Sequence, residues 1–361
     1  MRRLAWFLFG LTLAVALCAS FHDTPAIFSV PHPGLEPVLH EIAGIRLRCL
    51  LSGDARDLEG VYDTTTVSGT WAFEHEVGRV RYFREWLSKR LIEVVSVDSS
   101  LKTIDAGAGG EQAWASICHN VVLTYRRRQS QALNHMGVRT VHWMELVRMD
   151  GRWLIRKDWF WDPLGSSSRP RVPAEIEPAT APDPDEVPVA ASGSSYNRTA
   201  AVEYADRYCG VKTGTSTGRY NPRYRDFTNL GGDCANFASQ VLADREAGGL
   251  PMDGGWFYEA GEGTDAWIRS GGFVGHMLYN GRATLVKRGK YSAVAPLLSR
   301  LQPGDIIAYE ELGAVKHVCV VTGRDADGRV VVNSHTADRY HVPWDLGSED
   351  DHVFWLIHIT G

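Results

Sequence analysis

The sequence predicts an α+β protein made of two folded blocks, and three observations lead to this prediction. The chain has 361 residues, which is more than one ordinary domain contains. Positions 163–195 are rich in Pro, Ala, Ser and acidic residues, a composition that buries too little apolar surface to fold, so we expect a partly extended linker there. On each side of this linker, apolar residues first follow the period of a helix and then alternate as in strands.

The start of the chain predicts export. Met1–Arg3 is a short basic segment, positions 4–17 form an uncharged apolar run, and small residues follow at 18–20. This is the pattern of a secretory signal peptide, and the run is short for a membrane-spanning helix. We therefore expect a signal peptide at 1–20 and a protein that is secreted or held in the cell envelope. Two alternatives stay open: an uncleaved anchor, which is the one membrane contact we expect, and a lipid attached at Cys18.

The first block, expected at residues 24–162, begins with helical signals and ends with strands. Apolar and aromatic side chains recur every three or four residues over 73–91, which predicts an amphipathic helix. The pair Asp150–Gly151 is typical of a two-residue hairpin turn. Alternating apolar positions predict strands in this block at 91–97, 114–125, 140–148 and 153–156.

One run in the first block carries a resemblance. The residues HWMELVRMDGRWLIRKDWFWDP, at 142–163, resemble the last hairpin of the cone-shaped, helix-plus-bent-sheet domains called SnoaL-like. The resemblance covers the end of the block and implies a cone-like α+β module with an accessory or binding role. Its sequence has no pattern typical of acid/base catalysis, and we expect its polar residues to form a solvated face.

Charge and spacing exclude several classes of function. The formal net charge is -5 and the two signs are mixed along the chain, so the clustered basic surface that binds nucleic acid is not expected. There is no C-x-x-C, no H-E-x-x-H and no Asp-rich calcium loop, so neither a metal nor an organic cofactor is implied. Of the six cysteines, Cys18 lies in the signal segment, and the odd number that remains leaves at least one thiol free if the others pair.

The second block, expected at residues 196–361, is predicted to be helices followed by an antiparallel sheet. One helix covers 200–208, and another begins at Cys234 and is stopped by Gly248–Gly249. Turn residues and apolar runs then predict strands at 301–309, 317–323 and 329–336.

Cys234 is the candidate nucleophile of this block. It lies in the first turn of its predicted helix, where the helix dipole and unpaired N–H groups stabilise a thiolate and are placed to bind an oxyanion. Asp233 is a plausible N-cap, and the preceding pair Gly231–Gly232 leaves room for a substrate backbone. A buried, inert cysteine at a helix start fits this local pattern equally well.

The order of the polar residues after Cys234 favours the catalytic interpretation. His317 begins one predicted strand, and Asn333 and His335 end the next. A cysteine, a histidine and a third polar residue, in this order, form the set that a papain-like hydrolase needs. The imidazole takes the thiol proton, and the third side chain holds the imidazole in the correct tautomer.

Four motifs of the second block resemble one family. They are GGDCANFASQ at 231–240, PGDIIAY at 303–309, KHVCVVTG at 316–323 and SHT at 334–336. Together, and in this order, they closely resemble the amidase-domain family, which is related to the NlpC-type cell-wall peptidases within the papain-like superfamily. The resemblance covers nearly all of the second block and implies a papain-like cysteine hydrolase domain.

The resemblance also implies roles for particular residues. Cys234 corresponds to the nucleophile and His317 to the general base. His335 is the preferred third residue, with Asn333 as the alternative. Three further residues match polar positions of the family motif, and for them we expect capping and hydrogen-bonding roles rather than chemistry: Asp233, Asn236 and Gln240.

The function expected from the sequence is therefore that of an exported, cysteine-dependent amidase or peptidase. The Cys234 thiolate attacks an amide carbonyl, the amine leaves with a proton from His317, and water hydrolyses the thioester. The substrate is a peptide or another amide, and export and kinship make peptidoglycan stem peptides the natural choice. Two alternatives stay open: an inert envelope-binding protein, and a cysteine acyltransferase of the transglutaminase type.

Overall fold

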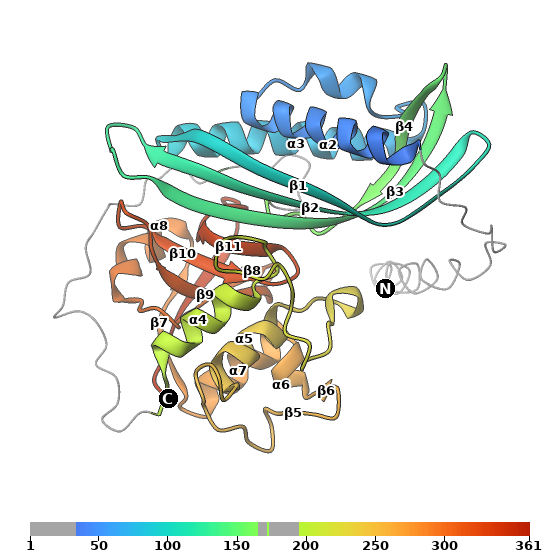
Figure 1. Ribbon diagram of the computed structural model, residues 1–361. Helices are drawn as coiled ribbons and strands as arrows, with labels where there is room; N and C mark the ends of the chain where they lie inside the picture. Colours follow the sequence, from blue (N-terminus) through green and yellow to red (C-terminus); the bar gives the residue numbers. More distant parts are fainter. Residues whose placement is uncertain (1–33, 165–171, 173–194) are drawn as a thin grey trace, which may run out of the picture.

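The computed structural model describes residues 34–164, 172 and 195–361 (Figure 1). The predicted signal peptide at 1–20 and nearly all of the predicted linker lie outside these residues. The described part combines helices with antiparallel strands, so the predicted α+β class is confirmed. None of the helices in the described ranges is both long enough and apolar enough to cross a membrane.

The first block agrees with the elements expected from its sequence. Its elements are α2 (Leu35–Ser52), η2 (Arg56–Gly60), α3 (Val67–Lys89), β1 (Ile92–Gly109), β2 (Gln112–Arg127), β3 (Asn134–Met149) and β4 (Arg152–Trp159). The predicted helix at 73–91 corresponds to α3, which ends two residues earlier, at Lys89. The helix also begins earlier, because the Thr66 side chain caps it by accepting a hydrogen bond from the Gly69 N–H. The Asp150–Gly151 turn has φ angles of 49° and 78°, which suit a two-residue hairpin.

The second block also contains the predicted helices and strands. Its elements are α4 (Arg198–Tyr208), η3 (Thr228–Leu230), α5 (Cys234–Ala243), β5 (Tyr258–Glu259), β6 (Glu262–Gly263), α6 (Asp265–Ile268), α7 (Ser270–Tyr279), β7 (Ala283–Gly289), α8 (Tyr291–Val294), η4 (Ala295–Arg300), β8 (Ile306–Glu311), β9 (Ala314–Arg324), β10 (Val330–Ser334), β11 (Asp338–Pro343) and β12 (Val353–Ile359). The prediction placed the end of α5 too late, at Gly248–Gly249. Asp244 ends the helix because its backbone is extended (ψ 138°) and its carboxylate accepts hydrogen bonds from the Glu246 N–H and from Arg223.

A single antiparallel sheet runs through both blocks. Its strand order is β1-β2-β3-β11-β10-β9-β8-β12-β7, and β4 also pairs with β3. The joint between the blocks is the pairing of β3 with β11, which places Arg139 opposite Asp338. It is reinforced by a buried ion pair in which Arg90 Nε donates to Asp345 at 2.5 Å, and by an apolar cluster that contains side chains of both blocks. The two blocks therefore share a sheet and part of a core.

Helices cover different faces of the sheet in its different parts. In Figure 1, α2 and α3 lie together on one face of β1–β3, and the second block lies on the other side. Within the second block, the face that α4, α5 and α7 cover contains Val318 and Val320, whereas the face that α8 and η4 cover contains Tyr309, Cys319 and Val321. Successive residues of β9 thus alternate between two cores, as the pleat of a strand requires.

Candidate active site

Cys234 is the first residue of α5 and lies almost fully inside the second block, with 5% of its surface exposed. The preceding Gly231 and Gly232 have φ angles of 114° and 117°, which only glycine adopts without strain. The Cys234 Sγ is 3.2 Å from the Ser270 Oγ, and the backbone N–H of Val318 lies near enough to lower the pKa of the thiol. Burial raises the pKa of the Cys234 thiol, and these two contacts offset the rise only in part. This arrangement therefore favours the neutral thiol over the thiolate.

His317 directly precedes Val318, whose backbone N–H lies near this thiol, but the ring of His317 does not lie beside Cys234. It is the register partner of Tyr309, and the two rings are 5.8 Å apart on the sheet face opposite α5. Its Nε2 is buried and has no hydrogen-bond partner. Burial, followed by the positive charge of Arg339, lowers the pKa of His317 to about 3. Among the described residues, no hydrogen bond joins His317 to Cys234.

A β-bulge lies directly beside these two residues. The register of β9 against β8 shifts between Tyr309 and Glu310, so that Lys316 is the extra residue. The Lys316 carbonyl accepts a hydrogen bond from the Ser270 hydroxyl, which also contacts Cys234. The bulge thus directs the backbone before His317 toward the thiol.

The two candidates for the third residue are engaged with other groups. His335 has 0% exposure and is stacked between Tyr220 and Phe237, at 3.5 and 4.0 Å between ring centroids. Its Nδ1 is 2.6 Å from the Asp233 carboxylate, and its Nε2 is 2.7 Å from the Tyr208 carbonyl. The Asn333 side chain donates to Asp206 and accepts from the His341 N–H. In the described parts of the chain, neither His335 nor Asn333 has a hydrogen bond to His317.

Asp233 is at the N-cap position of α5, but its side chain makes no capping bond to the helix. Its carboxylate accepts hydrogen bonds from the Phe227 N–H and from Asn236 Nδ2, both at 2.8 Å. Asn236 in turn accepts a hydrogen bond from the indole of Trp267. These contacts hold the loop before Cys234 against the body of the block.

Gln240 lies deeper along the same helix and contacts α4. Its Oε1 accepts a hydrogen bond from the Tyr204 hydroxyl at 2.9 Å. Like Asp233 and Asn236, it is buried and hydrogen-bonded within the protein.

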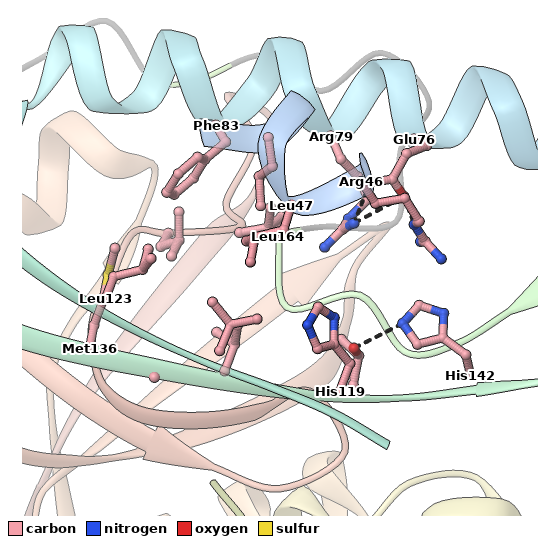
Figure 2. A pocket seen from close by; sticks show the side chains of 16 residues that line it. Arg46, Leu47, Glu76, Arg79, Phe83, His119, Leu123, Met136, His142 and Leu164 are labelled. Carbon is pink, nitrogen blue, oxygen red and sulfur yellow. Dashed lines mark hydrogen bonds and ion pairs between the residues drawn. The ribbon is translucent and has the colours of Figure 1, made fainter. Parts of the chain in front are cut away.

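A second polar site lies in the first block, where the sequence led us to expect only a solvated face. A cavity of about 50 Å³ lies between the helices α2 and α3 and the strands β2 and β3. Figure 2 shows the side chains that line it. One end is apolar and includes Phe83, Leu123 and Met136, and the other end includes Arg46 and Glu76. A cavity of this size holds a few water molecules.

The polar end of the cavity is a network of buried charges. Glu76 accepts hydrogen bonds from Arg46 at 2.6 Å and from Arg79 at 2.8 Å, and Arg46 also donates to Asp158 at 2.8 Å. Asp158 is 3.0 Å from His142 Nδ1. The sequence contained one signal of this network, because Arg46 occupies the helical stripe of α2 whose other members are apolar and buried. No group of three or more metal-ligating side chains is assembled here or anywhere else in the described ranges.

The imidazole of His119 also lines this cavity. Its Nε2 is 2.9 Å from the Ser99 hydroxyl. Burial, and then the charge interactions with His142, Arg46 and Arg79, lower the pKa of His119 to about 3, so the ring is neutral at neutral pH.

Comparison with known proteins supports an assignment for one block. No curated protein matches the chain, and no solved structure matches it either. The SnoaL-like resemblance of the first block stays a prediction. Residues 195–357, which make up nearly all of the second block, match the family model described as "Putative amidase domain". This match supports an amidase-domain family for the second block and, at that general level, the hydrolysis of C–N amide bonds.

Proposed function

We propose that the second block is a cysteine-dependent amide hydrolase in which Cys234 is the nucleophile and His317 the general base. One observation carries the proposal: within a domain that matches an amidase family, Cys234 is in the first turn of a helix that packs against β9, and its thiol lies near the Val318 N–H, directly after His317. The unpaired N–H groups of that helical turn are available to stabilise the oxyanion of a tetrahedral intermediate.

Catalysis in this proposal requires His317 to turn from the Tyr309 side of the sheet toward α5. The buried and unpartnered Nε2 supports such a movement, because a new bond to the thiol would remove an unsatisfied polar group. The bulge at Lys316 leaves the backbone of β9 irregular at this point. A neutral imidazole is the form that accepts a proton from the thiol.

The chemical steps then follow the general course of thiol catalysis. His317 removes the Cys234 proton, the thiolate attacks the amide carbonyl carbon, and the tetrahedral intermediate collapses as His317 returns the proton to the departing amine. Water then attacks the thioester, and the acid product and free thiol are released. His335 supports this chemistry through Asp233, since its ring is bound there and not to His317.

The place of action and the substrate are also proposals. The apolar run at the start of the chain supports export. The kinship with cell-wall peptidases that the sequence motifs predict supports cell-wall peptides as the substrate. The burial that raises the pKa of Cys234 and lowers that of His317 is the one observation in favour of the alternative, an inert envelope-binding protein.

The pH dependence of iodoacetamide labelling at Cys234, followed by mass spectrometry, tests the proposal. An ordinary thiol titrates near pH ~8.5 and an activated one well below that value. If His317 turns toward the thiol as proposed, we expect a low midpoint in the wild type and a midpoint near the ordinary value in His317→Ala. The control His135→Ala, whose exposed ring lies 3.1 Å from the Thr124 hydroxyl, should keep the wild-type midpoint. An ordinary midpoint in the wild type would show that Cys234 is structural and favour the binding protein.

If Cys234 is activated, product analysis separates hydrolysis from acyl transfer. A peptide substrate incubated with an added primary amine should give only the free acid if the enzyme is a hydrolase. A new amide product would instead establish the transglutaminase-type alternative.

A further inference from the structure

We propose that Arg139, in the first block, is a positioning residue for the loop that presents Cys234 in the second block. This inference rests on the proposed function and adds to it a role for the first block. It is carried by an uninterrupted series of buried and half-buried contacts that begins on β3 and ends at the residue before Cys234.

The first contacts connect Arg139 to the second block. Its Nε donates to the Asp338 carboxylate at 2.5 Å, and its Nη1 donates to the Gly218 carbonyl at 3.3 Å. Its guanidinium also lies over the Tyr220 ring, 4.9 Å from the centroid. Asp338 has only 2% of its side chain exposed, so Arg139 supplies the positive charge that this carboxylate needs to be stable inside the protein.

The next contacts pass from Asp338 to His335. The Tyr220 hydroxyl donates to the other Asp338 oxygen at 2.6 Å. The Tyr220 ring is parallel to the His335 ring, with 3.5 Å between centroids and 9° between planes. Because Arg139 and Asp338 fix the Tyr220 hydroxyl, they also fix the ring that packs on His335.

The last contacts reach the nucleophile loop on both sides of Asp233. The Asp233 carboxylate is 2.6 Å from His335 Nδ1, and its backbone N–H donates to the Thr336 hydroxyl, also at 2.6 Å. Asp233 is covalently joined to Cys234, so its position sets where α5 begins and where the first-turn N–H groups point.

The side chains around these contacts are closely packed, so a displacement of Arg139 is transmitted toward Asp233. A Cβ placed on Gly210 would come within 3.0 Å of each of its three nearest neighbours: Asp338, Tyr220 and Arg139. Packed interiors of this kind do not absorb a shift locally. A change at Arg139 should therefore alter the environment of the Cys234 thiol, although Arg139 does not contact that thiol.

The test compares the pH midpoint of iodoacetamide labelling at Cys234 in the full chain and in four variants. Arg139→Met removes the charge, Arg139→Lys keeps the charge but not the planar guanidinium, and Tyr220→Phe removes only the hydroxyl link. Arg126→Met is the matched control, because Arg126 on β2 is exposed and pairs with the exposed Glu93. The midpoint is measured rather than the rate, since a loosened loop also exposes the thiol. Circular dichroism verifies that each variant is folded.

We expect the midpoint to rise by about one pH unit in Arg139→Met, which is about a tenfold loss of thiolate at a given lower pH. The midpoint of Arg139→Lys should lie between those of the wild type and Arg139→Met. Tyr220→Phe should raise the midpoint by less than Arg139→Met does, and Arg126→Met should have the wild-type midpoint. If Arg139→Met does not fold, Tyr220→Phe decides the question. Folded variants with the wild-type midpoint would overturn the inference and leave the proposed function intact, whereas an ordinary midpoint in the wild type would end both.

Discussion

Glu76 is the buried carboxylate that Arg46 and Arg79 of the first block share. It has 1% exposure and receives hydrogen bonds from both Arg46 and Arg79. Replacing it by Gln would leave two buried guanidinium groups without their shared counter-charge. We expect Glu76→Gln to lower the free energy of unfolding by about 3–5 kcal/mol, measured by urea denaturation. Glu145→Gln, which breaks an exposed pair with Lys157, should cost no more than about 1 kcal/mol.

The pH dependence of this effect follows from the direction of the pKa shift. Burial alone would raise the pKa of Glu76, but Arg46 and Arg79 outweigh it and hold the pKa well below the ordinary value of 4.5. Stability from a lowered carboxyl pKa is complete above the unfolded value and is lost as pH falls through the folded value. The difference between wild type and Glu76→Gln should therefore be constant above pH 4.5 and shrink below it. A difference that grew toward acid would contradict this account.

At the scale of elements, the start of α5 depends on backbone that only glycine adopts easily. Gly232 has a φ of 117°, and a Cβ there would meet Thr336 no closer than 3.5 Å, so strain rather than collision sets the cost of a side chain. We expect Gly232→Ala to lower the free energy of unfolding by about 1–3 kcal/mol. Gly275→Ala is the control, since Gly275 lies inside α7 with open space around it. That change should raise the unfolding free energy by about 0.5–1 kcal/mol. Equal effects would show that the backbone of the nucleophile loop is unstrained.

At the scale of the whole molecule, the shared sheet predicts that the two blocks stay together when the predicted linker between them is cut. A protease site inserted between residues 173 and 194 would allow the chain to be cleaved there. We expect the two halves to co-elute in gel filtration at the position of the intact chain, because β3 stays paired with β11 and Arg90 with Asp345. Release of an isolated second half without denaturant would disprove this.

The second block made alone should fold poorly for the same reason. Without the first block, the carboxylates of Asp338 and Asp345 lose Arg139 and Arg90. An uncompensated buried charge costs about 3–5 kcal/mol, which is a large part of the stability of an ordinary domain. Near-UV circular dichroism of residues 195–361 should therefore show reduced tertiary packing relative to the cleaved, still associated protein.

The sequence by itself determined what depends on near neighbours along the chain. The pattern of apolar residues located α3, β1 to β4 and β8 to β10, but it missed β7, β11 and β12. The Asp150–Gly151 pair located a hairpin turn, and Gly231–Gly232 marked the start of α5 at Cys234. Each of these features is set by backbone preferences and by which face of an element is apolar.

Only the tertiary structure decided which side chains meet at the candidate site and what surrounds them. His335 lies against Asp233, 102 positions away, and Arg139 lies against Asp338, 199 positions away. The face that the His317 ring occupies follows from the register of β9 against β8 and from the bulge at Lys316. Local periodicity contains no information about register or about partners distant in the chain. These are fixed when the whole sheet assembles and each buried charge must find its counterpart.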